Sequence, residues 1–303
     1  MKAARIHAYG HSDQIVFEDI SQPEPGPREV LVKILDAGVN PADWKIREGL
    51  LAQAVPHTFP FTLGQDFCGE VLAIGSDVTD VEAGVHVFGF ANGAYAEFAV
   101  VDPEMFGPKP ATIDNETAAA LPTPGLTAMQ LVRQVGPARG HTILIHGAAG
   151  SVGSITTQLC LAAGARVLAT ASEDDAPYLI NLGVEQAIVY QTERFEDRVH
   201  DLDIVIDLVG GSTFARSISV VREGGLLITT VGPIDEAEGQ PIRAAQFLMR
   251  RNKQDLVELA QLVDRGAIRP RHPRVVPLAA ARNAQDAIQL HGRGAEKLVL
   301  SLV

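Results

Sequence analysis

The sequence predicts an α/β protein with two lobes, a doubly wound parallel sheet and a β-rich, barrel-like lobe. At 303 residues the chain exceeds the usual size of one compact domain. From residue 1 to about residue 121, the apolar runs are short and are interrupted by Gly and Pro, as in a β-rich lobe. From Thr142 onward, strand patterns alternate with helix patterns, which is typical of a parallel sheet covered by helices.

The expected elements follow from these patterns. In the first lobe, strands are expected at residues 29–39, 69–75, 84–90 and 95–101. In the second, strands are expected at 142–147, 166–171, 187–190, 202–210 and 225–232, and helices at 151–163, 176–182, 212–221 and 252–265. Residues 273–281 and 296–303 look like strands again, so the tail is expected to return to the first lobe. No Gly/Ser linker separates the lobes, so they should pack directly with a cleft between them.

A glycine-rich turn lies between the strand at 142–147 and the helix at 151–163. Gly147, Gly150 and Gly153 follow the spacing of a dinucleotide-binding fold, stretched by one residue. The first glycine permits the tight turn, the second lets backbone N–H groups approach a pyrophosphate, and the third lets the helix pack on the strand. Ser151 and Val152 open the helix and add N–H donors to this anion site. The turn therefore predicts a dinucleotide cofactor.

The same stretch permits a second interpretation. In "AGSVG", Ser151 could be the nucleophile of a serine hydrolase, with His200, His272 or His291 and Asp203 or Asp207 completing a triad. However, Ala149 stands where such elbows usually carry Gly, and a long β-rich lobe ahead of the strand is unlike a hydrolase core. The hydrolase is therefore the remote alternative.

Composition narrows the choice of partners. A formal net charge of -12 would repel phosphate backbones and anionic lipids, so neither nucleic acid nor a membrane surface is expected as a partner. Cys68 and Cys160 are the only cysteines, which suits a reducing compartment. No signal peptide or spanning segment is visible, so we expect a cytoplasmic protein.

Six stretches in the same order resemble the medium-chain dehydrogenase/reductase superfamily, in particular its zinc-free quinone and enone reductase branch. They are the glycine turn and residues 38–49, 63–71, 93–101, 118–130 and 203–211. The resemblance implies a GroES-like substrate domain made from both ends of the chain, at residues 1–122 and 256–303. It implies a Rossmann domain at residues 123–255, and hydride transfer in the cleft between the two domains.

The resemblance also bears on metal use. Zinc alcohol dehydrogenases of this superfamily carry a Cys where this chain has Asn40 and a His where it has Gln65. A neutral amide is a poor zinc ligand, so no zinc is expected. Without a Lewis acid, alcohol oxidation has no means of forming an alkoxide at neutral pH. Reduction of a quinone, an enone or an enal remains feasible, because the carbonyl of the acceptor takes up the developing negative charge.

Asn40 and Lys45 are the candidate catalytic residues. Asn40 offers amide donors to the acceptor oxygen, and Lys45 offers a cation for the carbonyl or for the nicotinamide ribose. The alternatives are a turn residue before Pro41 for Asn40 and a solvated surface side chain for Lys45. Asp43 is expected to cap or support this loop, and Trp44 to belong to the core.

Four further residues are placed near the nicotinamide by the resemblance. They are Thr123, Thr127, Val209 and Gly232. The two threonines could equally be caps at the start of a helix.

The cofactor preference depends on the end of the strand at 166–171. NAD-specific sites usually place an acid there to bond the ribose 2′-OH, whereas this chain has Thr170. Thr170 and Ser172 leave room for a 2′-phosphate, with Ser172 as a donor and Tyr190 as a wall. We therefore expect NADPH.

Three acids oppose this choice. Glu173, Asp174 and Asp175 follow Ser172, and at an effective dielectric of about 20 one like charge about 6 Å from the phosphate costs roughly 3 kcal/mol. Either the acids point to solvent while Arg293 or Lys297 supplies a cation, or the preference has shifted to NADH, the alternative cofactor.

Two further expectations concern assembly and turnover. A homodimer is expected from the family and from a sheet edge left exposed at residues 226–231. A catalytically weak NADPH-binding protein of the same fold is the other functional alternative, because a fold alone does not guarantee chemistry.

Overall fold

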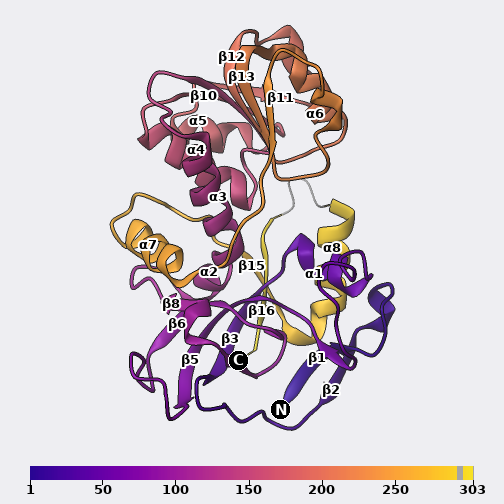
Figure 1. The fold of residues 1–303 in the computed structure, drawn as a ribbon, viewed down its shortest axis with the longest axis vertical. Helices are drawn as coiled ribbons and strands as arrows, with labels where there is room; N and C mark the ends of the chain where they lie inside the picture. The colour runs from indigo at the N-terminus through magenta and orange to yellow at the C-terminus, as the bar shows by residue number, and fades with distance from the viewer. Residues whose placement is uncertain (292–295, 303) are drawn as a thin grey trace. The chain divides into compact units, whose positions relative to one another are not determined.

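The structure is a computed structural model that describes residues 1–291 and 296–302 (Figure 1). The chain folds into two compact units. Unit 1 comprises Met1–Leu126, Arg251–Gly266 and Arg271–Val303, and unit 2 comprises Thr127–Arg250 and Ala267–Pro270. The C-terminal tail therefore joins the first part of the chain. The domain boundaries expected at 122/123 and 255/256 remain predictions.

Unit 2 contains the expected parallel sheet. Its strands are β9 (Thr142–His146), β10 (Arg166–Ala171), β11 (Gln186–Val189), β12 (Leu202–Asp207), β13 (Val221–Thr229) and β14 (Arg243–Gln246). The spatial order is β11-β10-β9-β12-β13-β14, with every neighbouring pair parallel. This is the order of a doubly wound dinucleotide-binding sheet. The order reverses beside β9, so the turn after β9 lies at the switch point where such sheets bind ligands.

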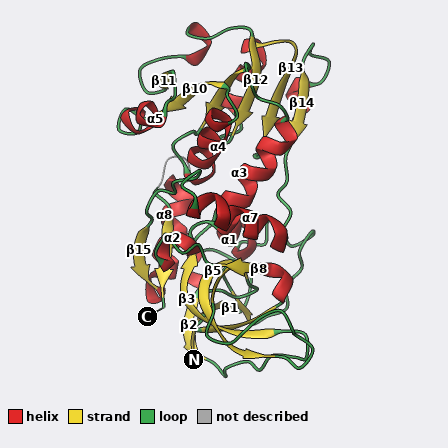
Figure 2. Cartoon of the chain, turned by 90° about the vertical axis from the view of Figure 1, so that its left-hand side faces the viewer, coloured by secondary structure: helices red, strands yellow, loops and turns green. Residues whose placement is uncertain are grey.

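Helices cover both faces of this sheet because its buried residues alternate between two cores. The helices are α3 (Pro122–Val135), α4 (Ser151–Ala162), α5 (Ala176–Leu182) and α6 (Ser212–Ser217). Ile143 and Ile145 of β9 share one core with residues of α3, α4 and α5, whereas Leu144 shares the other with Phe214 of α6. Figure 2 draws α5 beside β10 and β11, and α5 contacts both strands. The period of two in β9 thus produces the layered arrangement.

The expectation of an exposed edge at residues 226–231 is wrong. Most of this segment belongs to β13, which pairs with β12 on one side and with β14 on the other. The two edge strands of the described sheet are β11 and, next to β13, β14, whose sequence, RAAQ, has no hydrophobic pattern that predicts a strand. The backbone of β14 is held in the strand conformation by hydrogen bonds to β13, and its side chains give no sign of this in the sequence.

Unit 1 is β-rich, as expected. A three-stranded sheet has the order β2-β1-β4, and a seven-stranded sheet has the order β15-β16-β3-β5-β6-β8, with β7 paired to β3. The strands are β1 (Lys2–Ile6), β2 (Val16–Asp19), β3 (Val30–Gly38), β4 (Phe61–Thr62), β5 (Asp66–Ile74), β6 (His86–Phe90), β7 (Phe98–Val101), β8 (Phe106–Pro108), β15 (Arg274–Pro277) and β16 (Leu298–Ser301). Antiparallel pairing of β16 with β3 attaches the tail to this sheet. One core, which includes Val32, Phe67 and Leu300, joins its strands.

The helices of unit 1 include three that the sequence patterns did not predict. They are α1 (Pro41–Arg47), α2 (Asn115–Ala119) and α8 (Ala281–His291), whereas α7 (Lys253–Asp264) corresponds to the helix expected at 252–265. The strand expected at 273–281 is right only as far as Pro277, after which a 3₁₀ turn at Leu278–Ala280 leads into α8. The alanines from Ala279 to Ala281 favour helix over strand. α8 packs against α1. Arg47 of α1 is fully buried and donates hydrogen bonds to Gln285 and Gln289 of α8.

Within the described residues, no helix is both long and apolar enough to cross a membrane.

Candidate active site

The glycine turn of unit 2 has the backbone geometry that its sequence predicts. Gly147 has a φ of 70°, a conformation that side-chain-bearing residues rarely adopt, and it turns the chain sharply after β9. A Cβ placed on Gly153 would lie 2.1 Å from the carbonyl oxygen of Gly147 and 2.7 Å from the Cα of Ala148. Gly153 therefore lets α4 approach the turn more closely than any other residue would allow.

The start of α4 offers an anion site at the same place. Gly150 is the N-cap residue, and the first helical bond runs from the N–H of Ser154 to the carbonyl of Gly150. The N–H groups of Ser151, Val152 and Gly153 precede this bond, so the helix itself leaves them unpaired. A Cβ on Gly150 would meet only the Gly147 oxygen, at 3.4 Å. The turn and the helix start therefore fit the pyrophosphate of a dinucleotide.

The side chain of Thr170, at the end of β10, is turned into the protein. Its Oγ1 lies 3.0 Å from Nδ1 of the buried His146, whose Nε2 lies 3.0 Å from Oγ of Ser217. Ser217 already donates its proton to the Thr213 carbonyl, so Nε2 carries the ring proton and Thr170 donates to Nδ1. Burial lowers the pKa of His146 to about 3, which keeps this ring neutral.

The two other residues expected around the ribose lie after β10 and β11. Ser172 donates its hydroxyl proton to Oδ2 of Asp175 at 3.0 Å, and its Oγ accepts from the Asp175 N–H at 3.2 Å. One of the three acids is thus turned toward the serine that was expected to bind a phosphate. Tyr190 is 56% exposed, so its ring is available as a wall.

Residues expected near the nicotinamide occupy two settings. Val209 and Gly232 follow the carboxyl ends of β12 and β13, where parallel sheets place their ligand contacts. Thr127 is buried within α3. Thr123, in unit 1, donates from Oγ1 to the buried Asp66 at 2.6 Å and from its N–H at 3.0 Å.

Asn40 is the centre of a buried polar group in unit 1. It follows β3, is 3% exposed, and accepts from Nζ of Lys297 through Oδ1 at 2.6 Å. Lys297 also donates to the Val39 carbonyl at 3.0 Å, and burial lowers the pKa of its ammonium group. An ammonium group can only donate, so it fixes Oδ1 on its own side and Nδ2 on the other. Among the described residues, Nδ2 of Asn40 has no hydrogen-bond acceptor.

Asp43 lies in the first turn of α1 and caps this segment, as expected. Its Oδ2 accepts from the Asn40 N–H at 2.7 Å and from the hydroxyl of Tyr95 at 3.0 Å. Burial raises the pKa of the Asp43 carboxyl to about 7. Trp44 packs against the core of unit 1, also as expected.

The contacts of Lys45 and Lys297 differ from those expected from the sequence. The ammonium group of Lys45 lies 5.7 Å from the centre of the Trp44 ring. Lys297, expected to offer a cation for a 2′-phosphate, bonds to Asn40 instead. Arg293, the other candidate for that cation, lies outside the described residues. The catalytic role of Lys45 and the phosphate role of Lys297 remain predictions.

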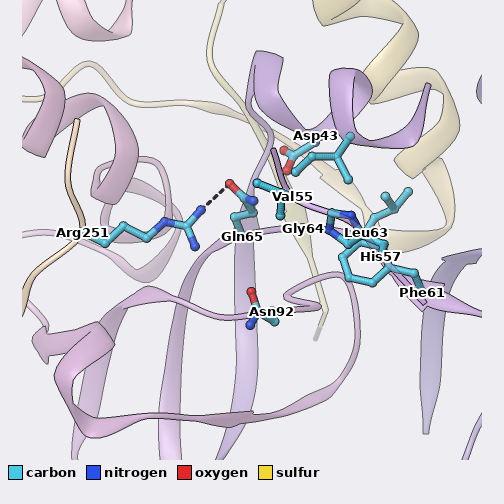
Figure 3. A pocket seen from close by; sticks show the side chains of 10 residues that line it. Asp43, Val55, His57, Phe61, Leu63, Gly64, Gln65, Asn92 and Arg251 are labelled. Carbon is cyan, nitrogen blue, oxygen red and sulfur yellow. Dashed lines mark hydrogen bonds between the residues drawn. The ribbon is translucent and has the colours of Figure 1, made fainter. Parts of the chain in front are cut away.

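A cavity of about 180 Å³ opens beside α1, and all of its lining residues belong to unit 1 (Figure 3). Its lining residues are Asp43, Ile46, Val55, His57, Phe61, Leu63, Gly64, Gln65, Asn92 and Arg251. In the view of Figure 3, Gln65 stands between Arg251 on one side and His57 with Phe61 on the other. Nη2 of Arg251 donates to Oε1 of Gln65 at 2.6 Å.

Three of the lining residues, Arg251, His57 and Asn92, are not predicted by the sequence. His57 and Asn92 lie in loops outside every motif, and Arg251 lies just before α7 in a run of polar residues. No local pattern indicates that any of them faces a cavity. Only the folding of distant segments brings them together.

The two positions that carry zinc ligands in the alcohol dehydrogenases do not fit a metal here. The oxygen of each amide would be its metal-binding atom, yet Oδ1 of Asn40 accepts from Lys297 and Oε1 of Gln65 accepts from Arg251. A zinc ion would have to displace two cations. Within residues 1–291 and 296–302, no cluster of three or more His, Cys, Asp or Glu residues could hold a metal.

The hydrolase interpretation finds no support in the described contacts. Ser151 is the first residue of α4, and no described histidine side chain hydrogen-bonds to it. His272 lies in unit 1, where it pairs with Asp114 at 3.2 Å, and His200 is exposed. The side chain of His291 lies outside the described residues.

Comparison with known proteins identifies the family. The model of the alcohol dehydrogenase GroES-like domain matches residues 26–111, and a model described as zinc-binding dehydrogenase matches residues 182–300. The 2-methylene-furan-3-one reductase of Solanum lycopersicum is 31% identical over 89% of this chain and 71% of its own length. The quinone oxidoreductase structure from Coxiella burnetii is 33% identical, with a TM-score of 0.93 over 100% of this chain and 99% of that one.

The Escherichia coli quinone oxidoreductase, solved in complex with NADPH, is 25% identical, with a TM-score of 0.87 over 99% of this chain and 100% of that one. These matches confirm the predicted fold class, a Rossmann-like parallel sheet with a GroES-like domain. The chain therefore belongs to the quinone oxidoreductase branch of the medium-chain dehydrogenase/reductase superfamily.

Proposed function

We propose that this chain is a zinc-independent oxidoreductase that uses NADPH to reduce a quinone or the C=C bond of an α,β-unsaturated carbonyl compound. The orphan amide group of Asn40 carries the proposal. A buried donor without an acceptor costs about 1–3 kcal/mol, so such a group persists where a ligand satisfies it. The carbonyl oxygen of an acceptor would do so, and it is the atom on which negative charge develops during reduction.

When bound, the reduced nicotinamide supplies a hydride. For an enone, that hydride and a proton from water or a nearby acid would add across the C=C bond, so that the acceptor gains two electrons and two hydrogens. The residues of the chain would bind the acceptor, orient it and stabilise the negative charge that develops on its oxygen. The Nδ2 group of Asn40 donates to the acceptor oxygen, while Lys297 holds the amide in the orientation that makes this possible. Lys45 remains a second candidate for the carbonyl or the ribose.

The residues proposed to hold the cofactor are those predicted from the sequence. Gly147, Gly150, Ser151, Val152 and Gly153 would bind the pyrophosphate through backbone N–H groups, and their geometry supports this role. Thr123, Thr127, Val209 and Gly232 are proposed for the nicotinamide end. Thr170, Ser172 and Tyr190 are proposed for the adenosine ribose.

One observation supports a preference for NADPH over NADH, and another opposes it. The Escherichia coli relative, whose structure contains NADPH, supports it. The bond from Ser172 to Asp175 opposes it, because a 2′-phosphate would have to compete with a carboxylate for that hydroxyl. We expect NADPH to bind more tightly than NADH in calorimetric titrations at low and at moderate salt. NADH binding more than tenfold tighter at both salt concentrations would reverse the assignment and make an acid after Ser172 the ribose ligand.

Activity is expected to survive complete removal of divalent metal. The reason is that the amides of Asn40 and Gln65 are held by cations rather than presented to a metal. Protein dialysed against a strong chelator should oxidise NADPH in the presence of a small enone or a benzoquinone, with the decrease of nicotinamide absorbance as the measure. Stoichiometric zinc by elemental analysis, together with loss of activity on its removal, would contradict the proposal. Zinc alcohol dehydrogenase treated in parallel is the control.

The same assay separates the alternatives. Tight cofactor binding with no acceptor reduced by any compound of a quinone, enone and enal panel would favour a binding protein without turnover. Ester hydrolysis abolished by Ser151→Ala would favour the hydrolase. A cytoplasmic homodimer remains part of the proposal on family grounds, and light scattering at micromolar concentration tests its oligomeric state.

A further inference from the structure

The cavity of unit 1 contains one cation that the fold positions without neutralising it. Arg251 is half-buried, its guanidinium carbon lies 4.8 Å from the centre of the Phe90 ring, and Gln65 accepts one of its hydrogen bonds. Gln65 lies just before β5, and Phe90 is the last residue of β6, the strand that pairs with β5. Stacking and hydrogen bonding thus hold the guanidinium plane in a fixed orientation.

No described carboxylate pairs with this guanidinium. A guanidinium has five N–H donors, and the described contacts of Arg251 are the bond to Gln65 and the stacking on Phe90. This separates it from other arginines of the chain, such as Arg166, Arg216 and Arg222, each of which pairs with an acid. In a chain with a net charge of -12, a positioned and unpaired arginine in a cavity is an unusual arrangement.

The remaining lining residues do not oppose an anion. Asp43 is the one acidic residue of the lining, and its Oδ2 already accepts hydrogen bonds from the Asn40 N–H and from Tyr95. Because burial raises the pKa of its carboxyl to about 7, Asp43 is largely uncharged in weakly acidic solution. Asn92 adds an amide to the lining, and Val55, Phe61 and Leu63 add an apolar side to it through their hydrocarbon side chains.

We propose that Arg251 forms a carboxylate subsite, so that the preferred acceptors are small unsaturated carbonyl compounds that also carry a carboxylate. A carboxylate accepts two parallel N–H bonds from a guanidinium, a geometry that a neutral ester cannot match. The apolar side of the cavity accommodates the short carbon skeleton. This inference specifies the acceptor class of the proposed reduction and rests on that function, but binding itself can be measured without turnover.

The binding test uses a saturated probe that cannot be reduced at its carbon skeleton. The probe is 4-oxopentanoate and its neutral match is methyl 4-oxopentanoate, each titrated calorimetrically into the full chain, with and without saturating NADP⁺. We expect the acid to bind at least 10-fold more tightly than the ester, and Arg251→Gln to weaken the acid about 10- to 100-fold while leaving the ester unchanged. Arg251→Lys should retain part of the preference, because it keeps the charge but loses the planar fork.

Arg250→Gln is the matched control, because it removes one positive charge from the adjacent exposed residue, which does not line the cavity. It should leave the ratio of acid to ester affinity unchanged. Thermal unfolding of each variant shows whether the fold is retained, and Arg251→Met repeats the test if the Gln variant is unstable.

Several results would overturn the subsite. Equal binding of acid and ester would do so, as would failure of both probes to bind, or an equal loss of both in Arg251→Gln. Weaker binding of NADP⁺ by Arg251→Gln, with the ratio of acid to ester unchanged, would instead assign the arginine to the cofactor. Turnover of 4-oxo-2-pentenoate and its methyl ester tests the proposed function separately: an acid preference in binding without any reduction would contradict the reductase and leave the subsite standing.

Discussion

Gly153→Ala is expected to abolish tight NADPH binding and to lower the unfolding temperature of unit 2. The added Cβ would lie 2.1 Å from the Gly147 oxygen and 2.7 Å from the Cα of Ala148, and both are backbone atoms that cannot rotate away. Relief requires α4 to move away from the turn, and such overpacking typically costs about 1–3 kcal/mol or more. The N–H groups at the helix start would move with it. Calorimetric titration with NADPH and differential scanning calorimetry measure the two effects.

Gly150→Ala is the matched control on the same turn. Its Cβ would meet only the Gly147 oxygen, at 3.4 Å, which is ordinary van der Waals contact, and the φ of Gly150 is -69°. The unfolding temperature should therefore stay close to that of the unmodified chain. NADPH affinity should still fall, because the new methyl group stands where the pyrophosphate is expected to approach. If Gly153→Ala bound NADPH normally, the turn would not be the cofactor site.

Asn40→Ala is expected to lower kcat by about 10²-fold or more while changing the dissociation constant of NADPH little. The substitution removes the Nδ2 donor that lacks an acceptor among the described residues, and with it the group proposed to stabilise the developing oxyanion. It also leaves the ammonium group of Lys297 without one of its two acceptors. Steady-state kinetics with an enone or a quinone, paired with cofactor titration, separates an effect on turnover from an effect on binding.

Two companion variants show which group is responsible. Lys297→Met should reduce kcat less than Asn40→Ala does, since it releases the amide orientation but keeps the donor. Asn40→Asp should fail to restore turnover, because a carboxylate offers no N–H to the acceptor oxygen. Lys45→Ala tests the other predicted catalytic residue, whose ammonium group lies over Trp44. Normal kcat in Asn40→Ala would show that Asn40 is structural.

The sequence predicted those elements whose pattern is local. The helix expected at 176–182 is α5, with the same bounds, and the strand at 166–171 is β10. β10 is a short, mostly apolar run, as expected of a strand in a buried parallel sheet, and Gly183 ends α5 in a left-handed conformation. The short edge strand β14 was missed because its four residues depend on pairing with β13 for their conformation.

Helices α1 and α8 were missed for a different reason. α1 was interpreted as a turn because it begins at Asn40 and Pro41, two residues that favour turns, and the contacts of Arg47 with α8 stabilise it as a helix. α8 follows directly on a strand and a 3₁₀ turn, so its start is hidden within a continuous apolar stretch. In both cases packing between distant segments decides the conformation.

The sequence alone is enough to locate the glycine turn that is proposed to bind the cofactor, because the requirements of Gly147 and Gly153 concern backbone geometry within a few residues. It is also enough for the order of strands and helices from β9 to β13, because each βα step has its own local pattern. The tertiary structure is needed to show which cations bond to Asn40 and Gln65, the two amides at the positions that carry zinc ligands in the alcohol dehydrogenases. Lys297 reaches Asn40 across 257 residues of sequence, and Arg251 reaches Gln65 across 186. The hydrogen-bond partner of a side chain at such a separation depends on the packing of the whole unit, so no local sequence pattern predicts it.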